Sequence, residues 1–159
     1  MNTVDILKYG QLTLLNTLKD FPEAEISTPG ACGVWSVKEI IAHLASYEHA
    51  LVEVLSGFLE GGPTPYLEKM GAGLQQFNDK EVALRRDRAM ANVLAELNDA
   101  HAQAMALAAR IPAETYRQNG TLPWYGSEYD LDDFIVYTYY GHKREHSAQI
   151  AAFRDRLSQ

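Results

Sequence analysis

The sequence predicts an all-α fold, a four-helix bundle, from three observations. Apolar residues recur at helical spacing in four segments, and no segment alternates apolar and polar residues as a half-buried strand does. Connections that contain proline or glycine separate these segments. Of the 159 residues, 47% are hydrophobic and 22% are charged, which is the balance of a chain that can bury one core. We therefore expect a single domain over residues 1–159, with its helices packed side by side.

The first two helices have clear boundaries. Residues 3–20 carry apolar residues at helical spacing, and Pro22 ends this helix because a proline disfavours helix in the residue before it. The second helix is predicted over residues 36–61 and begins with a capping box formed by Ser36 and Glu39. In such a box the serine oxygen accepts from the backbone N–H of the glutamate, and the glutamate side chain accepts from that of the serine.

The second half of the chain predicts two further helices. Residues 62–78 are rich in glycine and proline and are expected to form an irregular connection. Asn78 is placed to cap a third helix over residues 79–110. A second connection follows over residues 111–129. The last helix, over residues 130–157, begins with acidic side chains, which suit the positive end of the helix dipole.

Charge and composition exclude several classes of function. The net charge of −7 disfavours broad attraction to nucleic acid or to anionic membranes, so we expect neither as a partner. No apolar run approaches the roughly 18 residues of a membrane span, and the first residues do not resemble a signal peptide. Cys32 is the single cysteine, so we expect no disulfide within the chain and no thiol nucleophile at this loop position. A reducing, cytoplasmic location fits these features.

The strongest chemical signal is a pair of histidines in the last helix. His142 and His146 are four residues apart, so on a helix their Cβ atoms lie about 6 Å apart on one face. At about 100° per residue they share an arc of about 60° with the inward-facing positions Leu131, Ile135, Gln149 and Phe153. An unpartnered buried imidazole costs about 1–3 kcal/mol, and a shared metal ion would remove this cost. Histidines that hydrogen-bond within the core, or lie on the helix surface, are the alternative.

His43 is the expected third metal ligand. It lies on the second helix at the flank of the apolar stripe, which in a bundle faces a neighbouring helix. Three histidines from two helices would leave a coordination position open, as in catalytic rather than structural metal sites. We expect the two other histidines to play no part, with His49 in solvent and His101 partly buried on its helix.

Aromatic and acidic side chains near these histidines are candidates for the walls of a pocket. Tyr47 and Tyr139 each lie one turn from a candidate ligand, and Trp124 lies in the second connection. Simple packing is the alternative for each of these rings. Glu48 and Glu145 could orient a ligating imidazole, although a solvated carboxylate is the expected state of both.

These residues resemble the pattern of the DinB/YfiT-like superfamily. The likeness is carried by residues 35–44, which begin with a tryptophan and end in His-Leu, and by residues 142–150, which read HxxxHxxQI. The resemblance implies a four-helix bundle over essentially the whole chain. It also implies one divalent metal ion, zinc or nickel, held by His43, His142 and His146.

The resemblance implies more than one function. Relatives include S-transferases that use bacillithiol or mycothiol and a mycothiol-dependent maleylpyruvate isomerase, while a neighbouring branch protects its producers from a genotoxic metabolite. We therefore expect a metal-dependent transferase that activates a low-molecular-weight thiol for attack on a small electrophile, or a hydrolase. The alternatives are a non-catalytic protein that binds or sequesters a small molecule and a purely structural bundle. The resemblance also implies a homodimer.

Overall fold

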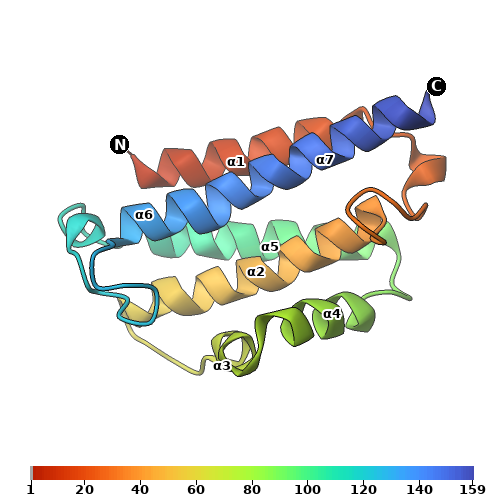
Figure 1. Ribbon diagram of the computed structural model, residues 1–159. Coiled ribbons are helices and arrows are strands. Elements are labelled where there is room, and N and C mark those ends of the chain that lie inside the picture. The colour runs from red at the N-terminus through yellow and green to blue at the C-terminus, as the bar shows by residue number, and fades with distance from the viewer. Residues whose placement is uncertain (1) are drawn as a thin grey trace.

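The computed structural model describes residues 2–159 and confirms the all-α fold (Figure 1). The described residues contain no strand beyond an isolated bridge between Cys32 and Trp35. None of their helices is long and apolar enough to cross a membrane. The helices are α1 (Thr3–Lys19), α2 (Val37–Gly57), α3 (Pro65–Ala72), α4 (Leu74–Leu84), α5 (Met90–Ala108), α6 (Leu131–Ile135) and α7 (Gly141–Leu157), with a π-helical turn η3 (Val136–Tyr140) and two short 3₁₀ turns, η1 (Glu23–Glu25) and η2 (Thr115–Arg117).

Four long helical stretches lie side by side. α1 runs beside α7, and α2 runs beside α5, while the shorter α3 and α4 lie against α2 on the other side (Figure 1). The predicted capping box at the start of α2 is confirmed: the hydroxyl of Ser36 accepts from the N–H of Glu39 at 3.2 Å, and the carboxylate of Glu39 accepts from the N–H of Ser36 at 2.9 Å. Asp130 and Asp133 form a second capping box before α6. Local sequence signals therefore fix where two of the long stretches begin.

The predicted boundaries between residues 62 and 110 are wrong in two places. The supposed connection over 62–78 contains α3 and the first turn of α4, and Pro65 begins α3 at a position that suits proline. The supposed helix over 79–110 is broken at residues 85–89, so that α4 and α5 are separate helices. Asn78 therefore lies inside α4 and caps nothing.

Contacts between distant segments explain the break after α4. Arg85, at the end of α4, is buried, and its guanidinium donates to Glu81 in its own helix at 2.8 Å and to Glu96 of α5 at 2.7 Å. Lys38 of α2 donates to two carbonyl oxygens of the turn, those of Arg86 and Arg88. The bonds from Lys38 satisfy backbone oxygens that a continuous helix would satisfy internally, and no glycine or proline marks the turn.

The last helix is continuous, as predicted, but it is not uniform. α6 passes into α7 through η3, and the backbone keeps helical angles at both junctions. A π turn holds one more residue than an α turn, so side chains after it are rotated relative to a constant 100° per residue. The predicted alignment of Leu131 and Ile135 with His142 therefore holds only in part. The first two are fully buried, whereas His142 is partly exposed.

Polar side chains divide the core at the middle of the bundle. One apolar cluster contains Leu7 of α1 and Leu51 of α2, and the other contains Leu14 and Leu44 of the same helices. Between these clusters lie polar side chains from each long stretch: the buried Gln11, Glu48 and Lys143 and the partly buried His101. The candidate metal ligands lie on the same stretches of α2 and α7 as two of these groups.

We predict that replacing Arg85 by methionine destabilises the protein by about 3 kcal/mol, because the buried carboxylate of Glu81 loses its main partner. Equilibrium unfolding in urea measures this loss. Arg86→Met is the matched control: Arg86 pairs with Glu39 at the surface, so its loss should cost less than about 1 kcal/mol. Equal stability of the two variants would contradict this role for Arg85.

Candidate metal site

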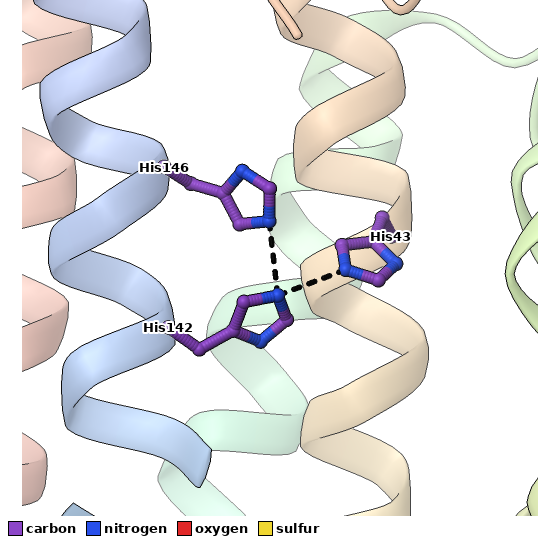
Figure 2. A group of neighbouring side chains, drawn as sticks. All are labelled: His43, His142 and His146. Carbon is purple, nitrogen blue, oxygen red and sulfur yellow. Dashed lines mark hydrogen bonds between the residues drawn. The ribbon is translucent and has the colours of Figure 1, made fainter. Parts of the chain in front are cut away.

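Three imidazole rings converge between α2 and α7 (Figure 2). His43 comes from α2, and His142 and His146 come from successive turns of α7. The Nε2 atom of His142 lies 3.0 Å from Nε2 of His43 and 2.9 Å from Nε2 of His146. One ligand atom from each ring falls within 4.8 Å of the other two. The structure thus brings together the three histidines that the sequence predicted as ligands.

Burial keeps these imidazoles neutral. Desolvation, together with the neighbouring imidazoles, lowers the pKa of His43 to about 3. Desolvation also lowers the pKa of His142 to about 4, with further contributions from His146 and Lys143. The pKa of His146 is lowered by burial too, although a hydrogen bond with Gln149 opposes the shift. At neutral pH all three rings are therefore in the form that binds a metal ion.

Two different devices orient the rings. Nδ1 of His146 lies 2.8 Å from the side-chain oxygen of Gln149, so this nitrogen donates and the lone pair is left on Nε2, towards the other histidines. His43 lacks such a bond, because its buried Nδ1 has no hydrogen-bond partner among the described residues. Its ring is held instead between Trp35 and Tyr47, with ring centroids 5.0 and 4.6 Å away.

The donor set fits a divalent metal ion. Two ligands of a tetrahedral zinc ion lie about 3.3 Å apart at usual Zn–N distances, which is close to the spacings between these nitrogens. Hydrogen bonds alone satisfy the group poorly, because the single Nε2 of His142 faces two other nitrogens and can offer them only one proton or one lone pair. Imidazole nitrogens from two helices would leave further coordination positions open.

The matching family model is that of the DinB superfamily, and it covers residues 7–150. The chain belongs to the DinB superfamily. The matched range includes all three histidines, and it confirms the resemblance that the sequence runs around them indicated. Neither the curated proteins nor the solved structures contain a significant match.

In this DinB-superfamily chain, one ligand candidate borders an open cleft. The cleft has a volume of about 450 Å³ and is lined by His142 together with Tyr47, Tyr137, Thr138, Gly141 and Glu145. His43 and His146 are buried, at 3% and 6% exposure, so the cleft reaches the triad from the side of His142. A small molecule in this cleft would therefore meet the triad at His142.

The predicted pocket residues gather around a separate cavity. Tyr47, Tyr139 and Trp124 all line an apolar cavity of about 720 Å³ beside the triad. Tyr47 is buried, and its ring centroid lies 4.8 Å from that of His142. The hydroxyl of Tyr139 points away from any rim, because it donates to the backbone oxygen of Tyr47 at 3.1 Å in the interior. Trp124 is 60% exposed.

The two acidic candidates, Glu145 and Glu48, lie in different environments. Glu145 is exposed, as predicted. Glu48 was expected in solvent, but it is fully buried, and its carboxylate pairs with Lys143 of α7 at 2.9 Å and with His101 of α5 at 2.8 Å. These partners hold the pKa of Glu48 below its ordinary value in spite of burial. Glu48 thus touches no ligand candidate through these bonds, but it ties α2 to α7 beside the triad.

The remaining candidates lie outside the triad. His49 is not free in solvent as predicted, since its Nε2 lies 2.9 Å from Glu96 and its ring stacks on Tyr66. His101 is partly buried, as predicted.

Burial and the nearby carboxylate of Glu145 raise the pKa of Cys32, which does not favour a thiolate. The sequence placed Gln149 on the inward face with His142 and His146 but did not predict its hydrogen bond with His146, which their spacing of three residues allows.

We predict that acid destabilises the metal-free protein below about pH 6.5. Because the histidine pKa values are lower in the folded state, the unfolded chain takes up protons first, and stability falls as the pH drops from about 6.5 towards 4. Each triad histidine contributes up to about 1.4 kcal/mol per pH unit. Urea unfolding at successive pH values measures the slope. His142→Gln should flatten it, and an unchanged slope in that variant would contradict the assignment.

Proposed function

We propose that the chain binds one divalent metal ion, zinc or nickel, through His43, His142 and His146, and uses it to activate a low-molecular-weight thiol. The observation that carries this proposal is the convergence of three neutral imidazole nitrogens beside an open cleft. The thiol would attack a small electrophile, forming a carbon–sulfur bond while the leaving group departs. Membership of the DinB superfamily supports a metal site of this kind.

The chain's own residues would hold and expose the reacting group. A bound divalent cation would supply Lewis acidity, which lowers the pKa of a thiol or water at an open position. Burial keeps the imidazoles deprotonated and fixes their direction, and the cleft beside His142 admits the co-substrate. The hydroxyl of Tyr47 is protonated at neutral pH, as in any tyrosine, and burial raises its pKa further, so it can donate a hydrogen bond to a bound molecule.

A second candidate is a protein that binds or sequesters a small molecule without converting it. The apolar cavity favours this function, because it is large enough for such a molecule, yet its walls carry none of the ligand candidates. Under this alternative the metal ion would help to hold the ligand.

We predict that the untagged protein binds one equivalent of zinc or nickel and that His142→Ala abolishes this binding. Elemental analysis and isothermal titration of the metal-stripped protein measure the stoichiometry. His49→Ala is the matched control, since it removes a half-buried histidine of α2 that lies outside the triad, and should leave metal binding unchanged. Sub-stoichiometric metal in the unmodified protein, or equal binding by both variants, would refute the metal site.

We predict that the metal-loaded protein conjugates a thiol to an aryl halide. Bacillithiol, mycothiol or cysteine would be incubated with 1-chloro-2,4-dinitrobenzene, and the thioether and released chloride would be measured. Removal of metal, or His142→Ala, should lower the rate at least tenfold. Stoichiometric metal and ligand-induced thermal stabilisation, with no product from any of these thiols, would instead support the sequestering function.

A further inference from the structure

The apolar cavity beside the triad is built by four parts of the chain. Its volume of about 720 Å³ falls within the range of small-molecule sites. The walls come from α2, from α3 and the start of α4, from the loop before α6, and from α6 with η3. The lining residues are Tyr47, Thr64, Leu67, Glu68, Met70, Gly71, Leu74, Trp124, Tyr125, Phe134, Thr138 and Tyr139.

The lining carries almost no charge. Glu68 is the one charged side chain on the described lining, and it is exposed. No lysine, arginine or histidine lines the cavity among the described residues, so nothing there would compensate a carboxylate or a phosphate taken out of water. The two threonines and the tyrosines supply only hydroxyl groups for orientation. This chemistry favours an uncharged molecule and excludes an anion.

Aromatic rings form a connected wall on one side of the cavity. Phe134 lies at its centre, with ring centroids of Trp124, Tyr125 and Tyr139 at 5.5, 4.9 and 5.4 Å. These pairs meet edge to face or nearly so, which leaves ring faces and edges available to a further flat ring. Trp124 is 60% exposed, as is expected of an aromatic side chain that gains burial when a ligand enters.

The cavity adjoins the triad through a shared wall. Tyr47 and Thr138 line both the apolar cavity and the open cleft that holds His142. The ring of Tyr47 touches the imidazoles of His43 and His142 on one side and Phe77 of α4 on another. A molecule in the cavity would therefore end at Tyr47, within reach of the cleft.

The helix α3 forms one wall of the cavity and lies at the surface of the fold. None of the residues of α3 is buried. Its first turn is held by Glu53 of α2, whose carboxylate accepts from the backbone N–H groups of Tyr66 and Leu67 at 2.9 Å each. Lys69 adds a contact with Glu81 of α4. Tyr66, Leu67 and Met70 of α3 are partly buried where they pack against the core, so α3 forms a wall of the cavity at the edge of the fold.

We infer that this cavity binds an uncharged aromatic molecule of about two or three fused or linked rings, with α3 as one of its walls. The inference deepens the proposed function, because it names the class of the small electrophile that would meet the thiol at Tyr47. The binding step itself requires no metal ion.

The test uses the uncharged fluorophore N-phenyl-1-naphthylamine with the metal-free protein. The fluorescence emission of the fluorophore should rise to saturation as protein is added, and the titration should fit one binding site per chain. Leu67→Glu places a charge on the lining and should weaken binding at least tenfold. Leu84→Glu, the same change at a residue of α4 that is 69% exposed and away from the cavity, should leave binding unchanged. If circular dichroism shows that Leu67→Glu is unfolded, Trp124→Ala is used in its place. This variant should bind the fluorophore at least threefold more weakly than the unmodified protein.

Competition between two matched ligands tests the class. The neutral 2-naphthol should displace the fluorophore at least tenfold more effectively than 2-naphthoate, whose carboxylate finds no cation in the cavity. Equal competition by the two, or equal fluorophore binding by the protein and its cavity variants, would overturn the inference. His142→Ala should keep fluorophore binding, so loss of the metal site and loss of the cavity site give different results.

Discussion

The carboxylate of Glu48 is the constraint on which the arrangement of the long helices depends. It is completely removed from water, and an ionised carboxylate in that position needs compensation from its neighbours. That compensation comes from Lys143 of α7 and His101 of α5, so a single side chain of α2 fixes the register of two other helices. Lys143 directly follows His142, and Glu48 lies little more than one turn after His43. Helices aligned by the ion pair therefore bring the ligand candidates together as well.

The polar side chains at the middle of the bundle, between the two apolar clusters, are groups that a purely apolar core would exclude. Gln11 of α1 is one of them and forms a bond to Asn98 of α5 at 2.9 Å. The charged pair is buried inside the bundle, whereas the neutral imidazoles lie between α2 and α7, where the cleft reaches His142. Both arrangements follow from one rule: buried polar atoms must find partners, either across the core or from a ligand.

The sequence predicted those features that depend on local chemistry. The capping box at Ser36 and the pairing of His142 with His146 needed only side-chain type and helical spacing. The convergence of His43 with this pair was indicated by its place at the flank of an apolar stripe and by the resemblance to a family. The break after Arg85 escaped prediction, because contacts with distant residues stabilise the turn and no glycine or proline marks it. The state of Glu48 escaped prediction too, since its partners lie on other helices. Whether a carboxylate is exposed or buried cannot be inferred without knowing which lysine, arginine or histidine packs against it.

The π turn has a consequence for the length of the last helix. The turn accommodates one residue more than an α-helical turn, and the residues on its two sides serve different structures: Phe134 lines the apolar cavity, and His146 belongs to the triad. If this stretch were regular α-helix with the same number of residues, everything after it would be rotated by about 100° relative to Phe134. The π turn therefore absorbs the extra residue and keeps the cavity wall and the triad in their present relation.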